Sequence, residues 1–296
     1  NSVSSSSKGG GTEYSVIATV QGCVINNEGT AVIDGVQINN NTVSASTNDN
    51  GDNATAQGGA IYNAQGAILK IQGDTSFSGN SVNASGANSN TAQGGAIYNA
   101  GAINVSGGST VFSNNSANNA ANDIYFADGS TMSLTEGSTV TLSSGIQSQN
   151  QNAQITVEGT SNLIQNNTNS SAYRGQINIQ SNGLLTFKGQ DLGVINSLNN
   201  AEINLSQNSG LGFEIENNIT LDAGDVMANF DTITPSGTLN IYKTGDNEMT
   251  LAGDFDGIAD EYNISGGKLI ASDENLASND TVNVNNAEFE YSTKCE

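Results

Sequence analysis

Four acidic residues lie within eight positions near the C-terminal end of the chain: Asp254, Asp256, Asp260 and Glu261. Carboxylate oxygens in a turn that contains glycine are ligands that Ca²⁺ prefers. The spacing D-x-D-G-x-x-D-E, however, matches neither the twelve-residue calcium loop nor the glycine-rich nonapeptide of calcium-binding repeats. We therefore favour a solvated acidic turn, with a calcium site as the weaker alternative. The case for a second candidate calcium site, formed by Asp49, Asn50 and Asp52, is weaker still.

Residues that perform catalysis are sparse. The chain contains no histidine, which excludes the Ser-His-Asp and Cys-His arrangements of nucleophilic enzymes. Arg174 is the only arginine and has no Asp or Glu near it in sequence, whereas a polysaccharide lyase needs a basic residue beside calcium-binding acids. A glycosidase needs only two carboxylates, so a polysaccharide-active enzyme stays open as an alternative. We expect a protein that is not an enzyme and has no cofactor.

The two cysteines, Cys23 and Cys295, lie close to opposite ends of the chain. Their number excludes a small disulfide-stapled scaffold, and their spacing excludes a zinc site built on cysteines. In a stack of about a dozen repeats at ~4.8 Å each, they would lie on the order of 50 Å apart, too far for a disulfide within one molecule. They are either two isolated thiols or the ends of an intermolecular disulfide that joins molecules into filaments.

The charge balance is strongly acidic, with 29 Asp and Glu against 7 Lys and Arg and a formal net charge of −22. Such a surface repels phosphate backbones and anionic lipid headgroups, so we exclude nucleic acid as a partner. No apolar run approaches the ~18 residues of a membrane-spanning helix, and we expect no direct insertion of this chain into a membrane. No signal-peptide pattern is visible. Because the chain begins at Asn1, we interpret it as a mature product or an excised fragment.

Short stretches of alternating apolar and polar residues predict β-strands with one buried face. They are AINV (102–105), TVTL (139–142), QITV (154–157), QINI (176–179), EINL (202–205), NITL (218–221), TLNI (238–241) and TVNV (281–284). Gly and Asn, the residues of turns, separate them. Corresponding positions recur every 20 to 26 residues, as at Ile155, Ile177 and Ile203. A repeat of this length predicts a β-solenoid, with an antiparallel sandwich as the main alternative.

The octapeptide QGGAIYNA occurs at 57–64 and again at 93–100. Each copy is followed by a GAI segment and then by FSGN or FSNN, so that one unit spans about 24 residues. A degenerate earlier copy lies at 29–45. Polar segments of about a dozen residues join the copies, and we expect those at 46–57 and 83–93 to project as loops.

The residues that recur in these copies have a structural interpretation. Glycines make a corner, isoleucines and phenylalanines point into the core, tyrosines point outward and stack, and asparagines close turns and form amide ladders. The set comprises Gly58, Gly59, Ile61, Tyr62, Asn63, Phe77, Asn80, Gly94, Gly95, Ile97, Tyr98, Asn99, Phe112 and Asn115. The alternative is a duplicated ligand site formed by the tyrosines and asparagines of the two copies.

These motifs resemble those of a known family. GGAIYN followed by FSGN or FSNN, within residues 29–117, resembles the paired GGA(I/L/V) and FxxN motifs of the polymorphic outer-membrane-protein repeat. KTGDNEMTLAGDFDGIADEYNISGGKLIA (243–271) is similar to the autotransporter passenger-associated repeat, with strands around 249–251 and 268–270 and an unusually acidic turn. Both repeats belong to autotransporter passengers, which Gram-negative bacteria export by type V secretion. The resemblance implies a right-handed parallel β-helix.

The same resemblance implies a function in virulence at the bacterial outer membrane. The chain is expected to be a surface-exposed or secreted passenger that acts as an adhesin or an elongated scaffold. Its expected partners are a host-cell or matrix receptor or glycan, bound by the loops at 46–57 and 83–93, or copies of itself. A filament subunit joined end to end is the alternative function.

The expected organisation is a flexible polar segment over 1–12 and a single β-helix over 13–296. Within it we expect GGAI/FxxN repeats at 29–117, plain repeats at 118–242 and acidic, passenger-associated-like repeats at 243–296.

Overall fold

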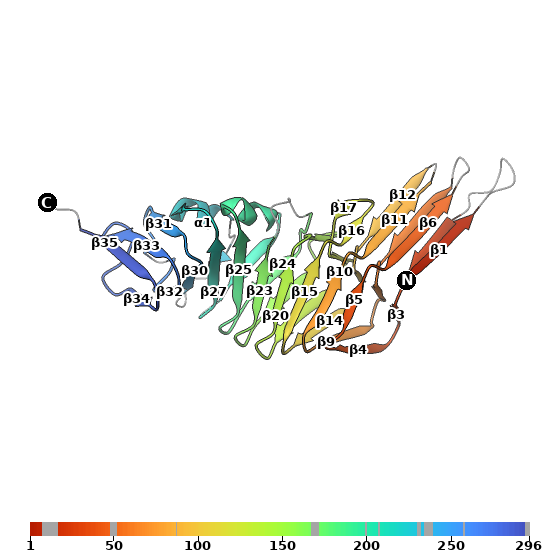
Figure 1. The fold of residues 1–296 in the computed structure, drawn as a ribbon, viewed down its shortest axis with the longest axis horizontal. Helices are drawn as coiled ribbons and strands as arrows, with labels where there is room; N and C mark the ends of the chain where they lie inside the picture. The colour runs from red at the N-terminus through yellow and green to blue at the C-terminus, as the bar shows by residue number, and fades with distance from the viewer. Residues whose placement is uncertain are drawn as a thin grey trace.

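The computed structural model describes residues 1–7, 17–47, 52–86, 88–166, 172–198, 200–206, 208–229, 232–233, 239–256 and 258–293 (Figure 1). These residues form an elongated stack of short strands that leads from the N-terminal to the C-terminal end (Figure 1). Of the described residues, 57% lie in strands and 4% in helices, so the prediction of an all-β fold is confirmed.

Four sheets form the body of the stack, numbered here in the order in which the chain enters them. The first body sheet contains β3 (Ile25–Asn27), β8 (Ile61–Asn63), β13 (Ile97–Asn99), β18 (Ile124–Phe126) and β21 (Ile146–Ser148). The second contains β4 (Thr30–Asp34), β9 (Ile68–Gln72), β14 (Ala102–Ser106), β19 (Thr131–Thr135), β22 (Gln154–Val157), β24 (Gln176–Ile179), β26 (Glu202–Leu205) and β29 (Thr232–Ile233).

The other two body sheets continue to the C-terminal end. The third contains β5 (Gln37–Asn39), β10 (Thr75–Ser78), β15 (Ser109–Ser113), β20 (Thr139–Leu142), β23 (Asn162–Gln165), β25 (Leu184–Gly189), β27 (Gly210–Ile215), β30 (Asn240–Thr244), β32 (Glu261–Ile264) and β34 (Thr281–Val284). The fourth contains β28 (Ile219–Asp222), β31 (Glu248–Ala252), β33 (Lys268–Ser272) and β35 (Glu288–Ser292).

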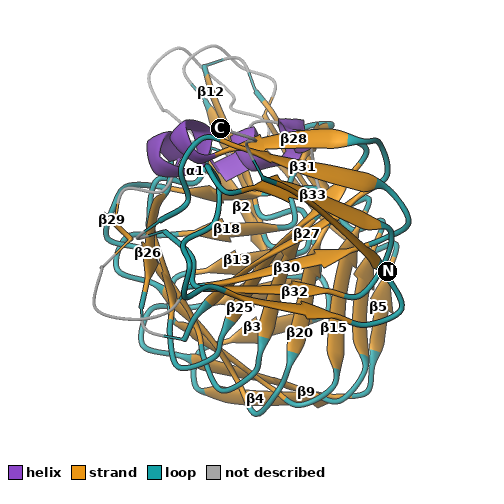
Figure 2. Cartoon of the chain, turned by 90° about the vertical axis from the view of Figure 1, so that its left-hand side faces the viewer, coloured by secondary structure: helices purple, strands orange, loops and turns teal. Residues whose placement is uncertain are grey.

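Two further sheets project from the N-terminal third of the body as a structure that we call the fin (Figures 1 and 2). In the outgoing fin sheet the chain leaves the body through β1 (Ser2–Ser7), β6 (Thr42–Thr47) and β11 (Ser81–Ser85), and the short β16 (Ser116–Ala117) and β17 (Ala120–Ala121) close this sheet. In the returning fin sheet it comes back through β2 (Ile17–Gln21), β7 (Asn53–Gln57) and β12 (Ser89–Gln93).

Paired strands are successive passages of the chain through the same sheet, and they run parallel. Ile61 lies beside Ile97 and Ile97 beside Ile124, for example. Among the described residues, β16 and β17 are the one antiparallel pair. We call each passage a layer, so that β1–β5 form the first layer, β6–β10 the second and β11–β15 the third. This pairing rules out the antiparallel sandwich and is consistent with a β-solenoid.

Alternation in the sequence explains why these segments become strands. Along β6, half-buried Thr42, Ser44 and Ser46 alternate with buried Val43, Ala45 and Thr47, because successive side chains of a strand point to opposite faces. All eight segments predicted from alternation lie in or overlap a strand of the structure. The two strands expected around 249–251 and 268–270 are β31 and β33, which pair with Met249 beside Leu269.

The fin corrects two expectations. Residues 46–57 and 83–93, expected as loops, contain β7 and β12 and the ends of β6 and β11. Residues 2–7, expected within a flexible segment, form β1 and pair with β6. Buried alanines and valines alternate through these polar segments, and they fill the space between the two fin sheets: Ala18, Val20, Val43, Ala45, Ala54, Ala56, Val82, Ala84 and Ala117.

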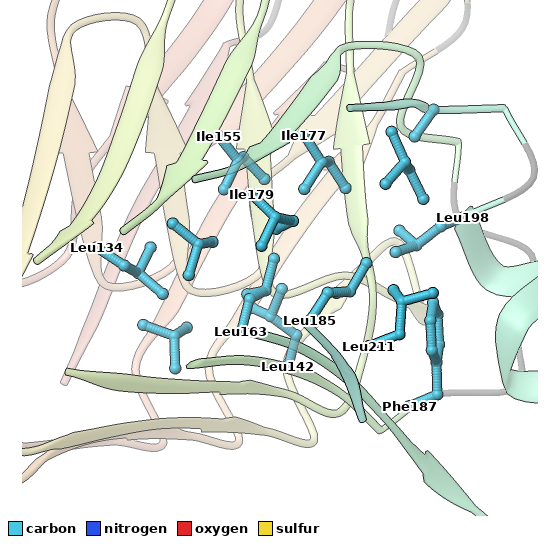
Figure 3. Packing of buried hydrophobic residues seen from close by; sticks show 14 of the residues in the cluster. Leu134, Leu142, Ile155, Leu163, Ile177, Ile179, Leu185, Phe187, Leu198 and Leu211 are labelled. Atoms are coloured by element: carbon cyan, nitrogen blue, oxygen red, sulfur yellow. The ribbon is translucent and has the colours of Figure 1, made fainter. Parts of the chain in front are cut away.

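The body encloses a single large apolar cluster that runs along the stack. Figure 3 shows side chains of the second body sheet, such as Leu134, Ile155 and Ile177, on one side of this core and those of the third, such as Leu163 and Leu185, on the other. Each layer adds its own apolar residues at the same positions, and Ile155, Ile177 and Ile203 lie in register. The core therefore grows with the number of layers.

Helices play a small part. A 3₁₀ helix, η1 (Leu192–Leu198), lies against β25 and buries Val194 and Leu198, and α1 (Ala223–Asn229) follows β28. No helix within the described residues is long and apolar enough to cross a membrane.

One column of the core contains two polar side chains. In the third body sheet the residues in register are Ile38, Phe77, Phe112, Leu142, Gln165, Phe187, Phe213, Lys243 and Ile264. Gln165 is 1% exposed, and neither end of its carboxamide has a hydrogen-bond partner among the described residues. A buried polar group without a partner destabilises a fold.

We predict that Gln165→Leu raises the free energy of unfolding by about 1–3 kcal/mol, because the buried carboxamide is replaced by a side chain that resembles its neighbour Leu142. Chemical denaturation monitored by circular dichroism measures this change. The control is Gln154→Leu, in which an exposed glutamine of β22 is replaced and no gain is expected. An equal effect of both substitutions, or a loss at Gln165, would contradict the prediction.

Candidate binding surface

The paired glycines of the octapeptide make a corner between the returning fin sheet and the first body sheet. Gly94 has a φ of 71°, which side chains other than glycine rarely tolerate. A Cβ atom on Gly95 would lie 2.3 Å from the carbonyl oxygen of Asn122 and 2.4 Å from the nitrogen of Ser116. Gly58 and Gly59 repeat this arrangement one layer earlier. The corner predicted for both pairs is present.

Past the corner, the inward and outward residues lie where alternation places them. Ile61 and Ile97 are fully buried. The rings of Tyr62 and Tyr98 stack with centroids 5.1 Å apart and an angle of 4° between their planes. Tyr125 continues the stack at 5.5 Å. The sequence analysis missed this third member because DIYF (123–126) lacks the two glycines, although IY recurs 27 residues after Ile97.

Asn63 and Asn99 belong to a buried ladder of amides that begins at Asn27. Asn27 Nδ2 donates to Asn63 Oδ1 at 2.7 Å, and Asn63 Nδ2 donates to Asn99 Oδ1 at 2.8 Å. The second hydrogen of Asn63 goes to the carbonyl of Ala102 at 3.1 Å. Asn27 and Asn63 thus each bind the next layer with two hydrogen bonds donated by the side-chain nitrogen.

The FxxN residues form a second set of columns. The rings of Phe77 and Phe112 stack in the core with centroids 4.7 Å apart. Asn80 Nδ2 donates to Asn115 Oδ1 at 3.1 Å and to the carbonyl of Ile38 at 2.8 Å. Asn41 donates in turn to Asn80 Oδ1 at 2.9 Å. The recurring Phe and Asn are therefore in the positions that the structural interpretation gave them.

The second ladder ends at a buried carboxylate, Asp123. Asn115 Nδ2 donates to its Oδ1 at 2.8 Å, and the backbone nitrogen of Ser144 donates to its Oδ2 at 2.7 Å. Burial raises the pKa of Asp123 to about 6, although the hydrogen bonds from Asn115 and Ser144 oppose this shift. No repeat motif marks this residue, so sequence reasoning missed it.

A third ladder lies on the surface beside the tyrosines. Gln21 Nε2 donates to Gln57 Oε1 at 3.0 Å, and Gln57 Nε2 donates to Gln93 Oε1 at 2.9 Å. The side chain of Gln57 also hydrogen-bonds Tyr98, whose pKa burial and the neighbouring tyrosines raise to about 12. This ladder was missed, although Gln57 and Gln93 open the duplicated octapeptide.

The outward faces of the fin carry hydroxyl and amide groups in register. On the returning sheet, Thr55 lies between Thr19 and Thr91, next to the column of three glutamines. On the outgoing sheet, Thr42 Oγ1 and Ser81 Oγ share a hydrogen bond of 3.0 Å. None of the outward positions of the described fin strands carries a charge. Apart from Ile17 of β2, which is 65% exposed, and the exposed alanines of β17, the fin thus offers a polar, uncharged face that makes hydrogen bonds.

The acidic residues near the C-terminus lie around Asp280, whose pKa is raised by burial and by the neighbouring Asp260 and Asp256. Asp254 and Asp256 are exposed, and Asp254 Oδ1 accepts a hydrogen bond from the backbone of Asp256 at 2.9 Å. Glu261 Oε1 accepts from Asn283 Nδ2 at 2.8 Å. In the described parts of the chain, no three His, Cys, Asp or Glu side chains come together to hold a metal ion. This arrangement gives the calcium alternative no support.

The remaining candidate residues lie apart from one another. Cys23 is a free, half-buried thiol of the first layer, and Cys295 lies outside the described residues. Asp52 is buried, whereas Asp49 and Asn50 lie outside the described residues. The exposed Arg174 forms no ion pair with a described acid. The structure therefore assembles no pair of catalytic side chains from them.

Lys243, the lysine of the KTG motif, has a role that the sequence analysis did not assign. It is 1% exposed, and its Nζ donates to the carbonyls of Gly245 and Gly266 at 2.9 and 3.0 Å and to Asn247 Oδ1 at 3.0 Å. Burial lowers the pKa of this lysine, and the nearby Asp246 opposes the shift. Lys243 therefore acts as an internal link between neighbouring turns.

No family model matches the chain, and neither a curated protein nor a solved structure matches it.

Asp123 makes stability depend on pH in a defined direction. Its folded-state pKa of about 6 lies above the ordinary value of 3.8, so the folded state binds this proton more tightly than the unfolded state. Stability should therefore rise as the pH falls from about 7 to about 4, by about 2–3 kcal/mol from this group. Urea denaturation of the wild type and of Asp123→Asn across this pH range measures the effect. The contribution of the other carboxylates is the same in both proteins and cancels in the difference between their free energies of unfolding. A difference that is independent of pH would contradict the prediction.

Proposed function

We propose that the chain is the passenger of an autotransporter-like bacterial protein, exposed at the cell surface or secreted, and acts as a non-catalytic adhesin or elongated scaffold. The sequence motifs of the octapeptide and of the KTG segment support this proposal by resemblance. The parallel, in-register layers support it as well, because they give a long scaffold from a short repeat.

The same proposal includes a right-handed parallel β-helix as the form of the stack. Connections between parallel strands of one sheet are right-handed in about 98% of cases, because a right-twisted strand packs back onto its sheet most readily that way. Each layer of this chain makes such connections between the strands of its body sheets, which favours the right-handed form.

The observation that carries the adhesin function is the fin. It projects from the body of the stack, and its outward faces present rows of uncharged hydroxyl and amide groups on an otherwise strongly acidic chain. A receptor or glycan that is itself anionic would be repelled by most of the molecule, but it can approach an uncharged face more closely. The partner class is therefore a polar surface that makes hydrogen bonds.

We expect Thr55→Glu to weaken binding of the purified chain to host epithelial cells by about tenfold or more, because it places a charge in the middle of the fin face. The matched control is Thr156→Glu, which changes an equally half-buried, outward threonine of β22 on the second body sheet. Flow cytometry with labelled protein measures both.

Equal binding of the two variants to the cells would show that the fin is not the surface by which the chain adheres. Absence of binding by the wild-type chain would contradict the adhesin function as a whole. Release of reducing ends from polysaccharides by the wild type would favour the enzymatic alternative.

A further inference from the structure

The returning fin sheet ends at an edge that lies inside the stack. This sheet contains three strands in the order β12, β7, β2, and no described strand lies along the outer edge of β12. From β12 the chain continues into β13 and on to β35 without entering this sheet again. The open edge is therefore made by the fold, at the layer where the fin stops, and not by an end of the chain.

The outgoing fin sheet is closed at the same level. β16 pairs with β11, so that Ser116 lies beside Ser81. Past this pair, the backbone nitrogen of Asn118 donates to the carbonyl of Val82 at 2.9 Å, and Asn118 Oδ1 accepts from the backbone nitrogen of Ala84 at 2.8 Å. Of two neighbouring edges, the chain thus covers one and leaves that of β12 open.

The open edge presents backbone groups that are free to pair. The carbonyl of Gln93 faces β7, since it accepts from the nitrogen of Gly58 at 3.0 Å. Successive residues of a strand direct their N–H and C=O groups to opposite edges. Those of Asn90 and Ala92 therefore face away from β7, where no described residue pairs with them.

Two hydrogen-bonding columns also stop at this edge. The nitrogens of Gly22 and Gly58 each donate to the carbonyl of a glutamine in the next layer at 3.0 Å. Gly94 occupies the same position and is buried, but its N–H has no acceptor among the described residues, which is rare for a buried amide. Gln93 ends the surface glutamine ladder, and its Nε2 donates to no described residue.

The core of the fin is uncovered at the same place. Ala54 and Ala56 of β7 are fully buried, because β2 and β12 lie on either side of them. The residues in register with them on β12 are Asn90, which is exposed, and Ala92, which is half-buried. A further strand with a small apolar side chain beside Ala92 would cover this end of the fin core.

Charge does not protect the edge. Open strand edges are usually guarded by lysine, other charged residues or proline, which discourage pairing. The segment between Asp74 and Asp123 contains no charged residue and no proline, although the whole chain has a net charge of −22. An uncharged segment can therefore approach this edge without leaving a charge unpaired.

The free groups also select the direction of an incoming strand. A parallel strand with a glutamine beside Gln93 supplies an acceptor to Gly94 and continues the ladder, as in each earlier layer. The β12 edges of two copies related by a two-fold axis would instead run antiparallel. Centred on Thr91, they would place Gln93 opposite Ser89 and leave both columns unfinished. The edge thus fits a separate extended segment better than a second copy of itself.

We propose that the edge of β12 binds an extended, uncharged segment of a partner protein, which adds to the returning fin sheet as a parallel fourth strand. Hydroxyl and amide side chains of this segment continue the columns of Thr91 and Gln93, and small apolar side chains cover Ala92. Main-chain hydrogen bonds supply the affinity, as in other cases of strand addition. The inference goes beyond the adhesin function, because it involves an edge of the fin rather than its outward faces.

Fluorescence anisotropy with a labelled, end-blocked peptide IATVQG tests the proposal. This sequence is that of residues 17–22, which form the same columns in the first layer, with Thr19 in the column of Thr91. We expect binding to the wild-type chain with a dissociation constant below about 1 mM. N-methylation of the peptide's threonine and glutamine removes the N–H groups that face β12 and should weaken binding by about tenfold or more. N-methylation of its alanine and valine, which face away, is the matched control and should leave binding unchanged.

A substitution in the chain provides the second arm. Ala92→Pro removes an N–H group of the open edge and should weaken peptide binding by about tenfold or more. Because that N–H bonds no described residue, the fold should persist, and circular dichroism checks it. The control is Ala92→Ser, which keeps the N–H at the same position and should bind the peptide as the wild type does.

Three results would overturn the proposal. The first is no binding of the unmodified peptide up to about 1 mM. The second is equal binding of the peptide by Ala92→Pro and Ala92→Ser, or equal binding of the two N-methylated peptides. The third is a wild-type dimer in sedimentation velocity that Ala92→Pro abolishes and the peptide does not inhibit, since this would assign the edge to a second copy. None of these measurements involves cells, so they are independent of the adhesin function.

Discussion

The buried amide of an asparagine has two N–H donors and one carbonyl to satisfy, and in this stack the next layer supplies what it needs. Asn63 accepts from Asn27 and donates to Asn99, so its hydrogen bonds exist only when three layers lie in register. A slip by one residue would leave these groups buried without partners, at about 1–3 kcal/mol for each. The amide ladders therefore fix the register on which the strand pairing, the stacked rings and the continuous core all depend.

This constraint also explains the unusual composition. A stack of parallel layers places like residues above one another, and charged residues in such columns would repel, whereas Asn, Gln, Ser and Thr can hydrogen-bond their own kind. The columns of Gln21, Gln57 and Gln93 and of Thr19, Thr55 and Thr91 follow this rule on the surface. In the acidic C-terminal layers, Lys268 lies in register between Glu248 and Glu288, so that a positive charge separates the two carboxylates of this column. Polarity without charge is thus a consequence of stacking.

The sequence was sufficient to predict the repeat, the strands and the roles of its recurring residues, because alternation and the GGAI and FxxN motifs report local geometry directly. It misjudged the fin, because polar segments with scattered alanines look like loops until two of them pack face to face. Asp123 and Tyr125 were missed since they stand where the repeat changes and the motif is lost. Gln165 and Lys243 were missed because only three-dimensional register shows that they lie in a column of core residues.

The central claim is that successive layers lie in register at a constant spacing, and distances between spin labels test it most directly. Lys70, Asn104, Ser133, Thr156, Asn178 and Asn204 form one outward column of the second body sheet. Pulsed electron paramagnetic resonance with labels at 70 and 178, four layers apart, should give a backbone separation of ~19 Å, and labels at 70 and 204 should give ~24 Å. A sharp increase of ~5 Å per added layer is the predicted result. Distances that fail to grow from the first pair to the second would contradict the stacked arrangement.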